Sequence, residues 1–159
     1  MDPEIIQEFC LETDSLIEEM LQILEQLESS PTEYKLLETF GQKVDRIMGA
    51  AKSLECHKMG TLSELCKTIS YKAAQSKNVE LVIIVVAFLF EAVEALGEMS
   101  SGLKETNQEV LNPVAMTTIQ SRLEFMAKKL SNIQRSSVAI SDKDLLEMSD
   151  TFNRLNKSK

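Results

Sequence analysis

The sequence has few of the residues that form turns and aromatic-rich cores. Its 159 residues include no Trp, five Gly and three Pro, and aromatic residues make up 5% of the chain. β-Sandwiches and barrels, which are rich in turns, usually contain more of these residues. We therefore expect an all-α protein, and the chain is long enough to bury a hydrophobic core in one domain.

Residues suited to redox or metal chemistry are also scarce. The three cysteines are odd in number and lack C-x-x-C spacing, and there is one histidine. Cys56, His57 and Cys66 match no usual zinc-site spacing, so we expect neither a metal nor another cofactor. We expect the cysteines to be reduced and the protein to be cytoplasmic.

Positive charge is in deficit. The chain has 17 basic and 25 acidic residues and a formal net charge of −8, which disfavours binding to nucleic acid. The longest apolar run, residues 81–90, is well short of the roughly 20 residues that span a bilayer, so we expect no membrane insertion. The acidic excess lies in residues 1–111, whereas residues 112–159 carry a basic excess.

Apolar residues recur at helical spacing through most of the chain. A first helix is predicted to open at Asp2-Pro3, an N-cap followed by a proline at the first helical position. A second is predicted to start at the capping box formed by residues 30–33, and its apolar residues have the most regular spacing. A third is predicted to start at Thr61, where Glu64 completes another capping box.

The second half of the chain predicts three more helices. Residues 79–99 include a β-branched run that would suit a buried strand, but no partner strand is evident and helical spacing continues, so a helix is favoured. Asn112-Pro113 starts a fifth helix over about 113–134. Ser141 opens a short sixth over about 142–157.

Short connections favour an antiparallel up-down four-helix bundle over residues 1–111. Residues 112–159 then form a C-terminal helical extension. The fourth helix is apolar on nearly every side, so we expect the fifth to pack on its outer side. The sixth is expected to dock on the chain, to dimerise or to stay unattached.

One row of residues on the second helix stands apart from its apolar stripe. At about 100° per residue, Gly41, Asp45 and Gly49 lie on one side of the helix. A mid-helix glycine costs roughly 1 kcal/mol relative to alanine, so two of them beside a carboxylate suggest close approach by another protein. Two plainer interpretations stay open: Asp45 is a solvated residue that pairs loosely with Arg46 or Lys43, and the glycines admit a neighbouring helix.

This pattern resembles the histidine phosphotransfer (HPt) domain, particularly the N-terminal phosphotransfer domain of chemotaxis-type histidine kinases. In that family the second helix carries His-x-x-Lys-Gly, and the imidazole passes phosphoryl groups to a receiver domain. The matching stretch, residues 45–49, reads Asp-Arg-Ile-Met-Gly, so the histidine and the lysine are replaced and the glycine is kept. The resemblance covers roughly residues 1–104.

The resemblance implies a binding module without catalysis. A histidine nitrogen is nucleophilic near neutral pH. Receiver domains, in contrast, phosphorylate a carboxylate with the help of Mg²⁺ held by neighbouring acidic groups and of a nearby lysine. We therefore expect a non-enzymatic regulatory module of a two-component or chemotaxis-type pathway, which binds a response-regulator receiver domain or a histidine kinase component. The residues expected to contact the partner are Gly41, Gln42, Asp45, Arg46, Met48, Gly49 and Lys52.

Two other functions remain open from the sequence. Phosphotransfer could pass through His57, which is expected in a turn ahead of Thr61, although its spacing from Lys58 and Gly60 differs from the family motif. Alternatively, the chain could be a homodimerisation or chaperone-like adaptor whose fifth and sixth helices supply the interface.

Overall fold

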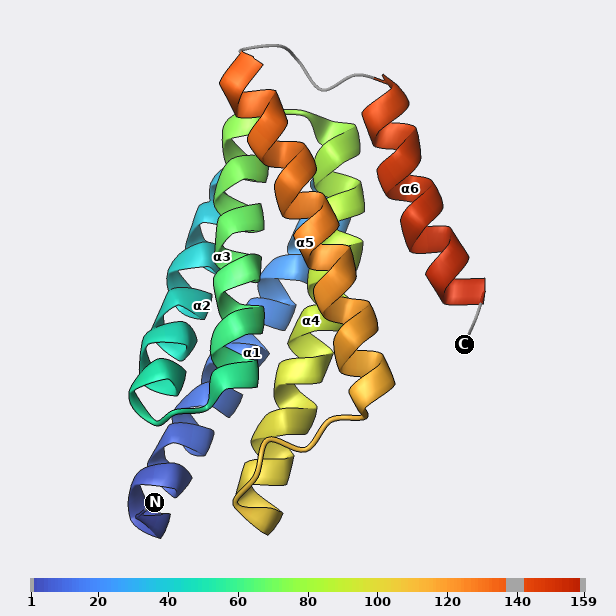
Figure 1. Ribbon diagram of the computed structural model, residues 1–159. Helices are drawn as coiled ribbons and strands as arrows, with labels where there is room; N and C mark the ends of the chain where they lie inside the picture. Colours follow the sequence, from blue (N-terminus) through green and yellow to red (C-terminus); the bar gives the residue numbers. More distant parts are fainter. Residues whose placement is uncertain (1, 137–141, 158–159) are drawn as a thin grey trace.

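The computed structural model describes residues 2–136 and 142–157, which form six α-helices (Figure 1). No strand occurs within these residues, so the expectation of an all-α protein is confirmed. The helices are α1 (Pro3–Ser29), α2 (Lys35–Ser53), α3 (His57–Ser76), α4 (Val79–Thr106), α5 (Pro113–Ser136) and α6 (Asp142–Lys157).

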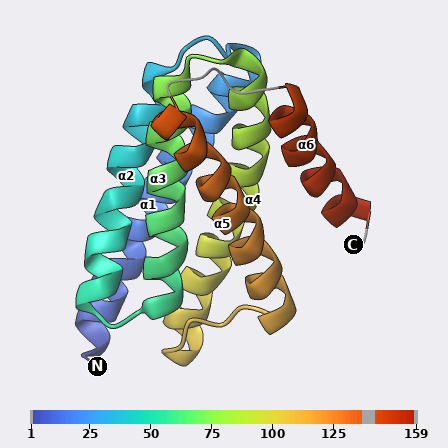
Figure 2. The ribbon, with the colours of Figure 1, turned by 45° about the horizontal axis from the view of Figure 1, so that its top comes forward.

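Helices α1 to α4 surround a common core. Helix α1 packs against α2 and α4, and α3 packs against the same two helices. The chain reverses direction at each connection, so neighbouring helices are antiparallel (Figures 1 and 2). The largest fully buried side chains include Phe40, Phe88, Met20, Leu24, Leu27, Leu37, Ile47, Met59, Leu62, Ile69, Leu81 and Leu89. All of them come from these four helices.

The predicted starts of α1 and α5 are confirmed. Asp2 Oδ1 accepts a hydrogen bond from the backbone N–H of Glu4 at 2.9 Å. Asn112 Oδ1 accepts one from the backbone N–H of Val114, also at 2.9 Å. Each side chain satisfies a donor that has no acceptor within the helix, which is the function of an N-cap.

The predicted start of α2 at Ser30 is wrong. Ser30 is the C-cap of α1, and its carbonyl accepts from the backbone N–H of Glu33 at 3.1 Å, so this segment forms a turn. Helix α2 begins at Lys35. The preceding Tyr34 donates its hydroxyl to the carbonyl of Lys77 at 3.1 Å. That bond joins the α1–α2 connection to the α3–α4 connection.

The predicted start of α3 at Thr61 is also wrong, because α3 begins at His57 and Thr61 lies inside it. The reason is a carboxylate from a distant part of the chain. Glu109, in the α4–α5 connection, accepts from the backbone N–H groups of Met59 at 2.7 Å and Lys58 at 3.3 Å. A local capping rule does not detect such an acceptor.

Helix α4 forms across the β-branched run, as the helical interpretation predicts, and extends to Thr106, well beyond the predicted end at Met99. It contacts α1, α3, α5 and α6, which explains its apolar composition. Ile83 is an exception, with 54% of its surface exposed. Among the described residues, no helix combines the length and the apolar character that crossing a membrane requires.

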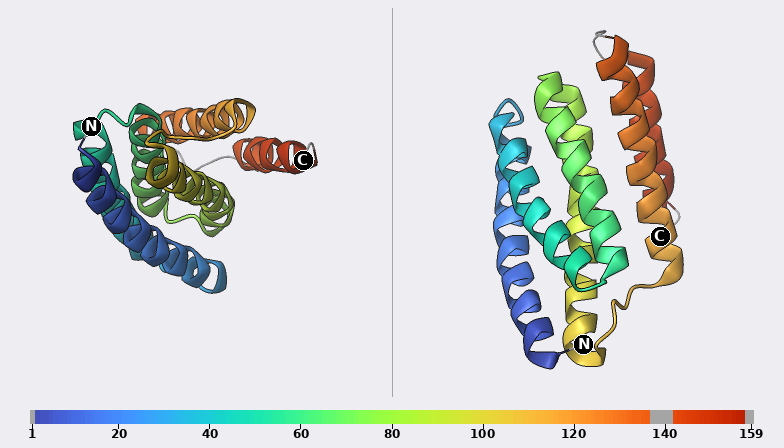
Figure 3. Two further views of the ribbon diagram at one scale, coloured as in Figure 1. Left: turned by 90° about the horizontal axis from the view of Figure 1, so that it is seen from below. Right: turned by 60° about the vertical axis from the view of Figure 1, so that its left-hand side comes forward.

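Helices α5 and α6 lie on the side of α4 that faces away from α1 (Figure 3). Helix α5 packs on α4, as expected, and it also packs on α3, which the sequence did not predict. The predicted range of α6 is confirmed, and Ser141 lies outside the described residues. Helix α6 docks on α4 and α5, where the Phe152 ring centroid lies 5.3 Å from that of Phe88.

All three cysteines are buried and form no disulfide. Burial raises the pKa of the Cys66 thiol from 9.0 to about 12, and burial also raises the pKa of Cys56, to about 11. A thiol is a nucleophile only as the thiolate, so these side chains should be inert core residues in the folded protein.

We predict slow reaction of the folded protein with an aromatic disulfide reagent at pH 8, and fast reaction once denaturant unfolds it.

The raised thiol pKa values also predict a pH dependence of stability. The buried thiols hold their protons more tightly than the thiols of the unfolded chain. Their contribution to the free energy of unfolding should therefore be fully present below pH 9 and be lost as the pH rises towards 12. Denaturant titrations between pH 7 and 11 measure this fall. Immediate labelling of Cys66 under native conditions would contradict the buried position.

Candidate functional site

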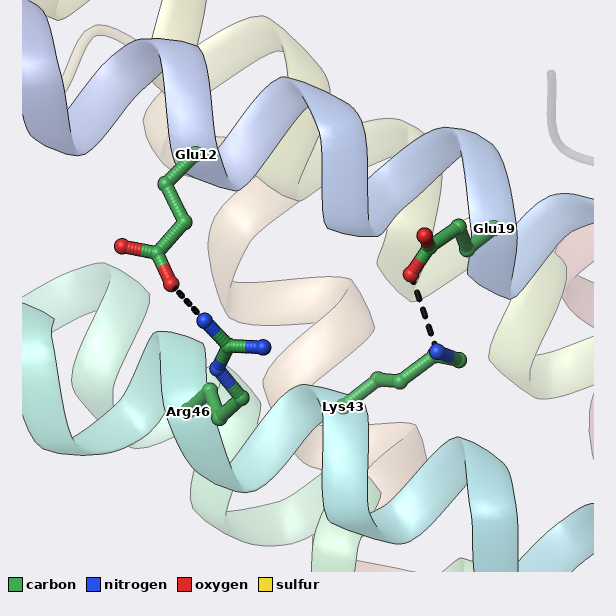
Figure 4. A network of polar contacts seen from close by, with 4 residues as sticks. All are labelled: Glu12, Glu19, Lys43 and Arg46. Carbon is green, nitrogen blue, oxygen red and sulfur yellow. Dashed lines mark hydrogen bonds and ion pairs between the residues drawn. The ribbon is translucent and has the colours of Figure 1, made fainter.

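The candidate site is the surface of α2 that lies between α1 and α3. On the α1 side, two ion pairs cross to the neighbouring helix (Figure 4). Lys43 Nζ donates to Glu19 Oε2 at 2.9 Å, and the Arg46 guanidinium pairs with Glu12. The side chains of Lys43 and Arg46 are therefore directed towards α1. The interpretation in which Asp45 pairs with one of them is wrong.

On the α3 side, Asp45 pairs with a residue that sequence reasoning missed. Lys67 Nζ donates to Asp45 Oδ1 at 2.8 Å, and this hydrogen bond raises the pKa of Lys67. The Asp45 side chain is 46% exposed, so a partner protein can still reach it. About two turns further along α2, Lys52 Nζ lies 3.4 Å from Glu64 Oε2.

The two glycines of the predicted row lie in different environments. The expectation that Gly41 is on the exposed face is wrong: it is buried, and an added Cβ would lie 2.9 Å from Ser70 Oγ and from Tyr71 Cζ. The absence of a side chain at Gly41 therefore lets α3 pack closely against α2, as the plainer interpretation proposed. Gly49 is exposed, and an added Cβ there would meet no atom within 4 Å.

The other predicted contact residues lie at or near the surface. Gln42, Arg46 and Lys52 are exposed, whereas Met48 is partly buried. Together with Asp45 and Gly49 they form one continuous face, and Gly41 is the only predicted member beneath it.

His57 lies beyond the C-terminal end of α2. It is the first residue of α3 and is exposed, rather than sitting in a turn ahead of the helix. Asp45 lies two turns before the end of α2 at Ser53, roughly 12 Å along the axis. Within residues 2–136 and 142–157, no group of three or more His, Cys, Asp or Glu side chains is placed to hold a metal ion.

Sequence reasoning missed Lys67 because its pairing with Asp45 depends on how α3 aligns with α2, and the sequence of α2 alone does not show that alignment. Helices α2 and α3 form an antiparallel hairpin about residue 56. Asp45 and Lys67 are equidistant from that centre, and so are Gly41 and Tyr71. Once this register is assumed, residue 67 can be identified as the neighbour of residue 45.

Comparisons with known proteins leave the family open. No protein-family model matches the chain, and neither curated proteins nor solved structures give a significant match. The resemblance to HPt domains therefore rests on the sequence, chiefly on residues 45–49 of α2.

The two glycines allow a matched test of the site's geometry. Gly49→Ala should stabilise the protein by roughly 1 kcal/mol, because alanine favours the helix and meets no obstacle. Gly41→Ala should be less stable than Gly49→Ala by about 1–3 kcal/mol, because Ser70 and Tyr71 must move. Urea unfolding of the two variants measures the difference. Equal stabilities would show that α3 does not approach α2 at Gly41.

Proposed function

We propose that the chain is an HPt-like binding module that docks a response-regulator receiver domain on α2 and does not transfer phosphate. In this proposal, α1 to α4 form the HPt-type bundle, and α5 and α6 are additions on the side away from α1. The function belongs to a two-component or chemotaxis-type signalling pathway.

The observation that carries the proposal is the open surface around Gly49. A glycine inside a helix weakens it, and packing explains Gly41 but not Gly49. The absence of a side chain at Gly49 leaves room for another protein's backbone beside Asp45. The flanking cations, Arg46 and Lys52, form ion pairs with Glu12 of α1 and Glu64 of α3.

The lack of phosphotransfer follows from the chemistry at position 45. The carboxylate accepts a hydrogen bond from Lys67, which occupies one oxygen and partly offsets the negative charge. A carboxylate is a weak nucleophile for phosphate unless a metal ion orients and neutralises the reacting oxygens. The module is therefore suited to hold a receiver without reacting with it.

A charge-introducing substitution at the open glycine tests the docking surface. Gly49→Arg should weaken binding to a receiver domain at least about tenfold, because the long side chain fills the space left for the partner. Gly97→Arg is the matched control, since an added Cβ on α4 also meets nothing within 4 Å. Calorimetric titration with receiver domains from the same genome measures both affinities.

Equal binding by both arginine variants, or no binding by any receiver, would contradict the proposal. Phosphotransfer is tested separately by incubating the protein with a phosphorylated receiver or a cognate kinase. Acid-labile phosphate that disappears in His57→Ala would show that His57 is the active group, and the module would then be catalytic.

A further inference from the structure

A second surface, between α4 and α5, is independent of the α2 face. A groove of about 380 Å³ runs between these helices beside the connection that joins them. Its lining combines carboxylates, aliphatic side chains and one arginine. The lining includes Glu94, Glu98, Leu111, Val114, Ile119 and Arg122.

Arg122 is the buried polar residue of the groove. Its side chain is only 2% exposed, and its Nη1 donates to Glu91. Its Nε is buried and has no hydrogen-bond partner among the described residues. A buried donor without an acceptor costs about 1–3 kcal/mol. Because Nε is shielded from solvent, a carbonyl of a ligand reaches it only after the Arg122 side chain moves.

The acidic wall of the groove points to a cation. Glu94 and Glu98 lie one turn apart on α4 and are both exposed. Neither forms an ion pair or a hydrogen bond with another described side chain, in contrast to Lys43 and Asp45 of α2. Two adjacent unpaired carboxylates favour an ammonium or guanidinium group between them.

The other wall of the groove is aliphatic. Val114 is 74% exposed at the start of α5, and Leu111, Ala115 and Ile119 continue the surface into the groove. Gly102 lets the α4–α5 connection lie against α4, because an added Cβ would be 2.9 Å from the backbone N of Val110. The α4–α5 connection therefore packs directly against α4 at one end of the aliphatic wall.

We propose that this groove binds a peptide segment of a partner protein in which a lysine or arginine is flanked by aliphatic residues. Such a segment supplies a cation for Glu94 and Glu98 and apolar side chains for the aliphatic wall. Its backbone carbonyls also supply the acceptor that Arg122 Nε lacks, once that side chain moves. A nucleic acid supplies no cation and would be repelled by the carboxylates.

Short peptides of defined sequence test this site by NMR titration of the ¹⁵N-labelled full chain. The probe is acetyl-Leu-Lys-Leu-amide, and the comparison peptides carry Glu in place of Lys or Gly in place of both leucines. We expect amide shifts at Glu94, Glu98, Ala115 and Ile119 with the probe alone. The double variant Glu94→Gln/Glu98→Gln should weaken its binding about fivefold.

The control variant is Glu25→Gln/Glu28→Gln, which removes two exposed carboxylates from α1 and should bind like the wild type. Each of three results would overturn the proposal: no shifts around the groove, equal shifts with the Lys and Glu peptides, or unchanged affinity in Glu94→Gln/Glu98→Gln. Shifts caused equally by the leucine-free peptide would show a charge-only surface and would also overturn it.

Discussion

The approach of α3 to α2 at Gly41 is the constraint on which the candidate site depends. Only a residue without a side chain allows Ser70 and Tyr71 to lie this close to the α2 backbone. With the two helices in this register, the next turn brings Lys67 to Asp45. Packing beneath the surface thus determines which charge faces the carboxylate above it, and the following turn, at Gly49, is left open.

The two surfaces proposed for binding differ in how their charges are used. On α2 the charged side chains around the site, Lys43, Asp45, Arg46 and Lys52, pair with α1 or α3, so shape is what remains for a partner to recognise. On α4, Glu94 and Glu98 have no such pair within the part of the chain that the structure describes, and charge can select the ligand. The net charge of −8 is therefore an incomplete guide to recognition, because paired and unpaired carboxylates contribute differently.

Periodicity predicted the helices well, since an amphipathic stripe is local information. Helix starts were predicted where the cap is adjacent in sequence, as at Asp2, and missed where the acceptor is distant, as at Glu109. The site followed the same rule. Gly49 could be placed on the surface from α2 alone, whereas the burial of Gly41 and the pairing of Asp45 depend on α3. The burial of Gly41 and the pairing of Asp45 are determined by tertiary neighbours and not by the geometry of α2.

Docking of a receiver domain on α2 can be tested by NMR mapping of its contacts on the ¹⁵N-labelled full chain. We expect a saturating receiver domain to shift the amide signals of Gln42, Asp45, Gly49 and Lys52 on α2 and of Lys67 on α3. We expect the signals of α5 to remain in place and no phosphoryl group to be transferred. Shifts confined to α5 and α6, with α2 unaffected, would contradict docking on α2.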